Sequence, residues 1–124
     1  MLKARDIMTS RVVTIQSLAT VADALELMRK HQVHALVVDR SGPEDAYGLI
    51  VDEDIVYNVI AEGEDPAVVQ VYEVMTKPCV VVNPDLSVEY VAKLFANVGI
   101  RCAPVIQEKL LGIISVSDIL HKSG

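Results

Sequence analysis

The sequence repeats itself, and this repeat limits the fold more than any other feature. Shifted by 67 positions, "DIMTSRVVTI" falls on "EVMTKPCVVV" and "TVADALELMRK" falls on "SVEYVAKLFAN". Past residues 41–46 the shift becomes 64, and "GLIVDEDIV" then falls on "GIISVSDIL". Identical residues recur from Met8, Thr9, Val13, Val21, Leu27, Val38, Gly48, Ile50, Asp54 and Ile55. Such self-similarity predicts two copies of one small structural unit.

Each copy is predicted to fold in the order β-α-β-β-α. Thr20 and Ser87 precede apolar residues at helical spacing and are good helix N-caps, and Asp23 completes a capping box with Thr20. Short β-branched and apolar runs indicate strands at 11–15, 34–39 and 47–51 in the first copy and at 79–83, 102–107 and 110–115 in the second.

A second helix is expected to close each copy, beginning at 52–54 and at 115–118. The first of these helices should end near Gly63, a favoured residue after a helix, with Pro66 soon after. The predicted boundaries are 5–61 for the first copy, 62–72 for an acidic linker and 73–122 for the second copy. Each copy alone would bury its helix faces poorly, so the copies should pack on one another about a pseudo-twofold axis.

Charge and hydropathy exclude two classes of partner. The formal net charge of −6 would repel nucleic acid. No apolar run approaches the roughly 20 residues of a membrane helix, and the start of the chain lacks a secretory signal, which predicts a cytoplasmic protein.

Residues 41–76 hold nine acidic residues and no Lys or Arg. This run is interpreted as a solvated face, with a docking surface for a basic partner as the alternative.

Metal binding and catalysis find little support in the sequence. The three histidines lack the spacing of metal ligands, and Ser115, Asp118 and His121 lie too close along one short helix to form a catalytic triad. Neither a metal site nor an enzyme is therefore expected. Cys79 and Cys102 form no C-x-x-C pair and are interpreted as small apolar side chains, with a redox switch as the alternative.

The repeat resembles a known family, the cystathionine-β-synthase (CBS) domain, over nearly the whole chain. The residues that carry the resemblance are "DIMT" and "EVMT", "VHALVVD" and "IRCAPVIQ", and "GLIVDEDIV" and "GIISVSDIL". The resemblance implies a mixed α/β fold, with two pseudo-symmetric CBS repeats packed as one Bateman module. Paired modules of this family usually associate, so at least a homodimer is expected.

Ser115 and Asp118 have two interpretations. At a strand-to-helix junction the hydroxyl and the carboxylate form a capping box, which needs no ligand. The same carboxylate could accept hydrogen bonds from the vicinal hydroxyls of a ribose. Short apolar strands would then supply a slot for adenine.

The resemblance further implies ligand sites made by one repeat together with the other. The main site would comprise Thr9, Val13, His34, Ala35, Gly112, Ile114, Ser115, Ser117 and Asp118. A second, weaker site would comprise Gly48, Ile50, Asp54, Thr76, Val80, Arg101 and Cys102. It is expected to be weaker because Val51 stands where the second repeat has Ser115.

The phosphate-binding residues depart from the family pattern. Ala35 and Cys102 occupy positions where phosphate-binding members often carry arginine. His34 and Arg101, one position earlier, are the nearest substitutes, although each also has a purely structural interpretation as a surface histidine or an ion-pairing arginine. We therefore expect phosphate groups to contribute only modestly to ligand affinity.

Two functional hypotheses follow. The first is a regulatory sensor that binds AMP, or next ATP or ADP, and controls a partner protein or a fused domain. S-adenosylmethionine or another adenosyl compound remains an open alternative for the ligand. The second hypothesis is a ligand-free platform for dimerisation or interaction. Neither requires an obligatory cofactor, and the chain could be a complete protein or the sensing half of a longer one.

Overall fold

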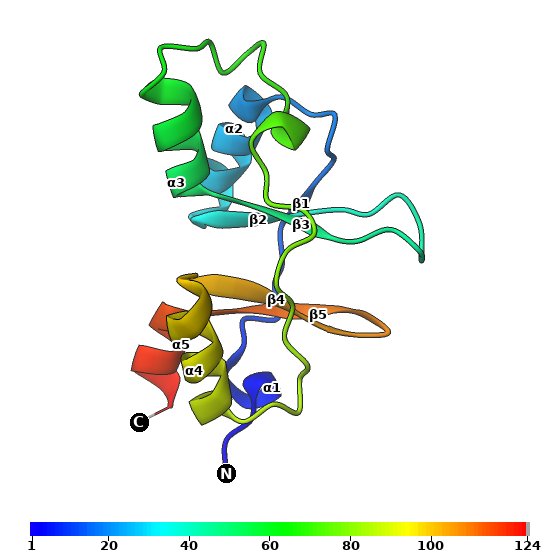
Figure 1. Cartoon of the computed structure of the whole chain (residues 1–124), viewed down its shortest axis with the longest axis vertical. Helices are drawn as coiled ribbons and strands as arrows, with labels where there is room; N and C mark the ends of the chain where they lie inside the picture. Colours follow the sequence, from blue (N-terminus) through cyan, green and yellow to red (C-terminus); the bar gives the residue numbers. More distant parts are fainter. Residues whose placement is uncertain (124) are drawn as a thin grey trace. The chain divides into compact units, whose positions relative to one another are not determined.

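The computed structural model describes residues 1–123, which form a mixed α/β fold with two compact units (Figure 1). The first-repeat unit comprises Val13–Cys79. The second-repeat unit combines Met1–Val12 with the chain from Val80 onward. The two copies predicted from the sequence are thus both present, but the first twelve residues pack with the second copy.

The first-repeat unit contains a three-stranded sheet in the order β1-β2-β3. Strands β1 and β2 are parallel, and β2 and β3 are antiparallel. Its elements are β1 (Thr14–Ile15), α2 (Val21–His31), β2 (Ala35–Val38), β3 (Gly48–Val51), α3 (Asp52–Ile55), a π-helical turn (Val56–Ile60) and a 3-10 helix (Val71–Glu73). The strand expected at 11–15 is reduced to two residues. Its core is built from aliphatic side chains, including Leu36, Val38, Ile50 and Ile55.

The second-repeat unit contains an antiparallel pair of strands, β4 and β5. Its elements are α1 (Ala4–Ile7), α4 (Val88–Val98), β4 (Cys102–Gln107), β5 (Lys109–Ser115) and α5 (Val116–Lys122). The core includes Ala4 and Ile7 from α1 together with Phe95, Val105 and Ile114. Because α1 supplies core residues, the N-terminal segment is an integral part of this unit.

The predicted helix signals are confirmed. Thr20 and Asp23 form the capping box, since each backbone N–H donates to the other side chain at 3.1 Å. Ser87 accepts a hydrogen bond from the Tyr90 N–H at 3.4 Å and caps α4. Gly63 has a φ of +71° and closes the turn that follows the π-helical segment, as expected for a residue after a helix.

The strand predicted at 79–83 is wrong except at Val82, which forms an isolated parallel bridge to β4. In the first-repeat unit the Val37 N–H donates to the Val13 carbonyl at 3.1 Å and extends the ladder toward the N-terminus. The residue at the position equivalent to Val37 is Pro104, which has no N–H. The ladder therefore stops at Val82, whose own N–H donates to the Pro104 carbonyl at 2.9 Å.

The start of each copy docks on a strand of the other copy. Thr9 pairs with Ile113 of β5, and the equivalent Thr76 pairs with Leu49 of β3, both as antiparallel bridges. Within the predicted linker at 62–72, Val69 and Val71 are buried in the first-repeat core. The boundaries predicted at 5–61 and 73–122 follow the repeat in the sequence, whereas the packing units are Val13–Cys79 and Met1–Val12 with the chain from Val80 onward.

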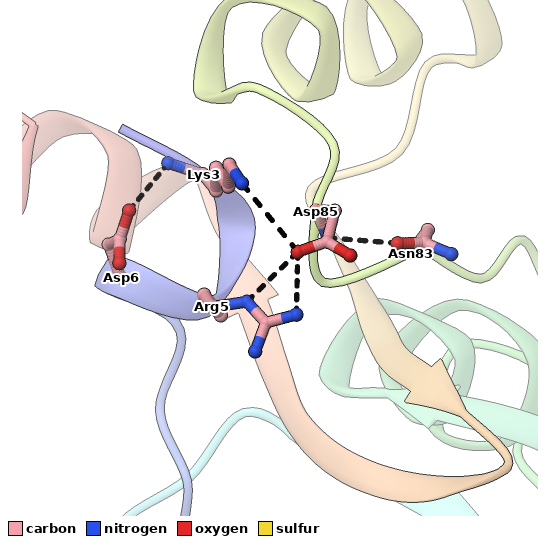
Figure 2. A network of polar contacts seen from close by, with 5 residues as sticks. All are labelled: Lys3, Arg5, Asp6, Asn83 and Asp85. Carbon is pink, nitrogen blue, oxygen red and sulfur yellow. Dashed lines mark hydrogen bonds and ion pairs between the residues drawn. The ribbon is translucent and has the colours of Figure 1, made fainter. Parts of the chain in front are cut away.

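A polar network holds the N-terminal segment to the loop before α4 (Figure 2). Asp85 Oδ1 accepts hydrogen bonds from the Arg5 guanidinium and lies 3.9 Å from Lys3 Nζ. The Asp85 N–H donates to Asn83 Oδ1, and the Lys3 N–H donates to Asp6 Oδ2. The Lys3, Arg5 and Asp85 side chains are about half exposed, so solvent screens these ion pairs.

Candidate functional site

Asp118 lies in the first turn of α5, directly after β5 ends at Ser115. The Ser115 Oγ accepts a hydrogen bond from the Asp118 N–H at 3.0 Å. In return, the Ser115 N–H and hydroxyl donate to Asp118 Oδ2 at 2.9 and 3.0 Å. This is the capping box predicted from the spacing, and it fixes the position of the carboxylate.

The second carboxylate oxygen of Asp118 has donors from both ends of the chain. The Thr9 hydroxyl donates to Oδ1 at 3.2 Å, and the Lys122 ammonium lies 2.9 Å from the same atom. Asp118 is only 8% exposed, so water solvates its carboxylate little. The donors of the chain therefore compensate its negative charge. A carboxylate has about four acceptor positions, and four donors of the chain occupy them here.

Gly112 brings the N-terminal segment close to β5. A Cβ at this position would lie 2.7 Å from the Thr9 carbonyl oxygen and 2.8 Å from the Met8 Sδ. The missing side chain therefore permits the close approach of another backbone. Ile114, two residues later, is completely buried in the core of the same unit.

The structure brings together part of the predicted main site. Within the second-repeat unit, Thr9 and Ser115 contact Asp118, Gly112 contacts the Thr9 segment, and Ser117 is exposed in the first turn of α5. The other predicted members, Val13, His34 and Ala35, belong to the first-repeat unit. Their participation with Asp118 remains a prediction.

Asp54, the counterpart of Asp118, has a different environment. Its Oδ2 accepts the Val51 N–H at 2.9 Å, but valine offers no hydroxyl. Burial raises the pKa of Asp54, the Val51 N–H opposes this rise, and the neighbouring carboxylates of Glu53 and Asp52 add to it. Asp54 is therefore a half-buried carboxylate whose charge is disfavoured.

The predicted second site also divides between the units. Gly48, Ile50, Asp54 and Thr76 lie in the first-repeat unit, and Val80, Arg101 and Cys102 lie in the second-repeat unit. A Cβ on Gly48 would lie 3.2 Å from the Met75 Sδ and 3.3 Å from the Thr76 carbonyl oxygen. This contact matches the one at Gly112 but is less tight. The pairing of the two groups remains a prediction.

The backbone carbonyl groups of His34 and Arg101 accept hydrogen bonds from the first residues of α3 and α5, which are equivalent helices. The His34 carbonyl accepts the Asp52 N–H at 2.9 Å, and the Arg101 carbonyl accepts the Val116 N–H at 2.8 Å. The His34 side chain is 89% exposed, with its Nδ1 3.6 Å from Asp52 Oδ2. Their backbones thus satisfy N–H groups of α3 and α5, a role independent of any phosphate.

Comparison with known proteins establishes the family of this chain. The family model described as the CBS domain matches residues 4–61 and 71–124. The chain belongs to the CBS-domain family. Its two CBS repeats are the tandem pair of a Bateman module, as the resemblance of the sequence implied.

Relatives of this tandem CBS chain include several with similar extent. The CBS domain-containing protein YhcV from Bacillus subtilis is 34% identical over 116 residues, which cover 93% of this chain and 81% of YhcV. A hexameric CBS-CP12 protein from bloom-forming cyanobacteria has 58% identity and a TM-score of 0.97, over 99% of this chain and 72% of that one. The CBS domain pair of protein MJ0100, solved with 5′-methylthioadenosine and S-adenosyl-L-methionine, has 22% identity and a TM-score of 0.84, over 97% and 94% of the two chains.

Other relatives are longer. The chain spans 57% and 52% of the lengths of two further curated relatives. Within residues 1–123, no helix combines the length and apolar character needed to span a membrane.

Lys122 is a site residue that the sequence reasoning did not identify. It lies four positions after Asp118 on α5, a spacing at which acidic and basic side chains meet on a helix. That spacing was the signal that could have identified it. The equivalent residue of the first CBS repeat is Asn58, so the two acidic positions differ in charge compensation as well as in the Ser115 hydroxyl.

The cysteines of the CBS repeats are half-buried, and the residues described contain no disulfide. Burial raises the pKa of the Cys79 thiol. Because the thiolate is the reactive form, this shift lowers the reactivity of Cys79 at neutral pH. The interpretation of Cys79 as a small, partly buried side chain therefore gains support over the redox switch.

Proposed function

We propose that this chain is a regulatory module that binds an adenine nucleotide, with AMP the first choice and ATP or ADP next. Asp118 accepts hydrogen bonds from the ribose hydroxyls. The observation that carries the proposal is the buried Asp118 carboxylate, which Ser115 and Thr9 fix at a strand-to-helix junction. An oriented carboxylate suits a vicinal diol because its oxygens accept hydrogen bonds from hydroxyl groups, and a ribose would replace donors of the chain at Oδ1.

The ligands of one structural relative support an adenosine-containing ligand. The MJ0100 pair was solved with 5′-methylthioadenosine and S-adenosyl-L-methionine, which share the adenosyl group. In this chain Ala35 and Cys102 offer no cationic side chain for a phosphate. Affinity should therefore come mainly from the adenosine portion, and the number of phosphates should matter little.

Regulation would act through self-association. The hexameric state of the CBS-CP12 relative supports a homodimer or a larger homo-oligomer for this chain. A ligand shifts such an assembly only by its difference in affinity between the two arrangements. We therefore propose that nucleotide binding changes the assembly that a partner protein or fused domain contacts, and that the module itself catalyses no reaction.

The second candidate function is a ligand-free interaction platform. It is favoured by the contacts of Asp118 itself, because donors of the chain already satisfy both carboxylate oxygens. On this hypothesis Asp118 only stabilises the junction of β5 and α5. The oligomer would then be the same with and without nucleotide.

Calorimetric titration distinguishes the two functions. AMP, ADP, ATP and S-adenosylmethionine are titrated into the wild type, Asp118→Asn and the matched Asp54→Asn, with folding checked by circular dichroism. Asp118→Asn should weaken nucleotide binding about tenfold or more, since a charged hydrogen-bond acceptor is lost. Asp54→Asn should still bind nucleotide at the main site with the affinity of the wild type. Absence of heat with all four compounds would favour the platform.

A further inference from the structure

The Lys122 side chain makes two contacts at the predicted ribose position. Its ammonium lies 2.9 Å from Asp118 Oδ1 and donates to the Ile7 carbonyl at 3.3 Å. The Lys122 side chain is 47% exposed, whereas that of Asp118 is 10% exposed. A flexible cation at the surface therefore covers one oxygen of a buried anion.

The donors on Asp118 differ in how firmly they are held. Those on Oδ2 come from Ser115 and belong to the cap of α5, so displacing them would disturb the start of that helix. On Oδ1, the Thr9 hydroxyl can rotate about its C–O bond and can itself accept a hydrogen bond. The Lys122 ammonium only donates, and its long stem allows it to leave without any change in the backbone.

We propose that Lys122 is an affinity-setting residue that competes with the ribose hydroxyls for Asp118 Oδ1. This inference rests on the proposed function, because it assumes that Asp118 binds a ribose. The protein binds ligand only in the fraction of molecules in which the Lys122 contact is open, so the apparent affinity is lowered by that fraction. Asn58 carries no charge at the equivalent position, so the competition is specific to the second CBS repeat.

The test compares adenosine with AMP, because adenosine has the same diol and no phosphate. Both are titrated into the wild type and into Lys122→Met, which keeps a long unbranched side chain but removes the cation. The matched control is Lys93→Met on α4, where Lys93 pairs with Glu89 at 3.4 Å across the same helical spacing. Lys122→Gln and Lys122→Arg provide two further variants, should Lys122→Met fail to fold by circular dichroism.

Lys122→Met should tighten adenosine binding about twofold to fivefold, the range for loss of a partly exposed ion pair. Lys122→Gln should give a smaller gain, Lys122→Arg keeps the cation and should give no gain, and Lys93→Met should match the wild type. A gain for adenosine with a loss for AMP also supports competition, and it assigns the released ammonium to the phosphate.

The opposing outcomes separate the two proposals. If adenosine binds the wild type, and Lys122→Met and Lys122→Gln bind it equally or more weakly, the competition is overturned. The proposed function would still stand. If neither compound binds the wild type or any variant, the proposed function fails and the competition fails with it.

Discussion

Thr9 donates a hydrogen bond to Asp118 at 3.2 Å, although 109 positions separate the two residues in the chain. The contact exists because the N-terminal segment packs with the second CBS repeat, where Thr9 also pairs with Ile113 through two backbone hydrogen bonds of 2.8 and 2.9 Å. The beginning of the first repeat thereby helps to orient the carboxylate of the second. Changes near the N-terminus should therefore affect the properties of Asp118.

Replacing Thr9 by valine tests this dependence. Valine keeps the branched shape but removes the hydroxyl, so Thr9→Val should lower the free energy of unfolding by about 1 kcal/mol. It should also weaken nucleotide binding, since Asp118 loses one orienting donor. Thr76→Val, at the equivalent position of the other repeat, is the control in urea denaturation and calorimetry. Equal binding by Thr9→Val and wild type would contradict the role of this hydroxyl.

The two equivalent glycines should respond differently to a methyl group. In Gly112→Ala the new Cβ would lie 2.7 Å from the Thr9 carbonyl oxygen, a backbone atom that cannot move without breaking its bridge to Ile113. We expect a loss of about 2 kcal/mol or more in the free energy of unfolding. In Gly48→Ala the nearest atoms lie at 3.2 to 3.3 Å and include the flexible Met75 side chain, so the loss should be smaller. Thermal and urea unfolding of both variants measure the difference, and a greater loss in Gly48→Ala would reverse the expected order.

Burial rather than charge should hold the N-terminal segment in place. Ile7 is 2% exposed in the second-repeat core, so Ile7→Ala should cost about 2 to 4 kcal/mol of unfolding free energy. Arg5→Gln removes the half-exposed ion pair with Asp85 and should cost less than about 1 kcal/mol, decreasing further in salt. Urea denaturation at low and high salt compares them. A loss in Arg5→Gln equal to that in Ile7→Ala would contradict this order.

Local signals in the sequence predicted most elements correctly. Thr20 with Asp23 and Ser115 with Asp118 marked helix starts because a capping box depends only on residues three positions apart. The strand at 79–83 was wrong because its hydrogen bonds depend on a partner strand. Pro104 in that partner removes a donor, and this effect is visible in the sequence only once the pairing is known.

The exchange of N-terminal segments could not be predicted, for a different reason. Met8 and Thr9 recur as Met75 and Thr76, and the strands on which they dock are equally similar to one another. Each segment therefore carries the same local signal for either strand. The choice between them depends on the length and path of the intervening chain, which a pattern of apolar residues does not encode. For the same reason, the contact of Thr9 with Asp118 was implied only by the resemblance to the family.

The stability of the first-repeat unit should depend on pH through Asp54. Burial raises the pKa of Asp54 above its usual value of 3.8, so the folded state binds the proton more tightly than the unfolded chain does. The free energy of unfolding should therefore fall as pH rises from 3.8 through the folded pKa. Asp54→Asn cannot ionise and lacks this loss, so its stability relative to the wild type should increase from about pH 3 to about pH 7.

Asp45→Asn provides a control with the opposite sign. The hydrogen bond from Lys77, followed by those from Ser41, lowers the pKa of Asp45, whose contribution to stability is therefore present above 3.8 and lost as pH falls. Asp45→Asn should thus lose stability relative to the wild type as pH rises, where Asp54→Asn gains it. Urea denaturation at a series of pH values measures both differences. Parallel pH profiles for Asp54→Asn and the wild type would mean that burial does not destabilise the charged form of Asp54. Asp54 would then not differ from Asp118 in the compensation of its charge.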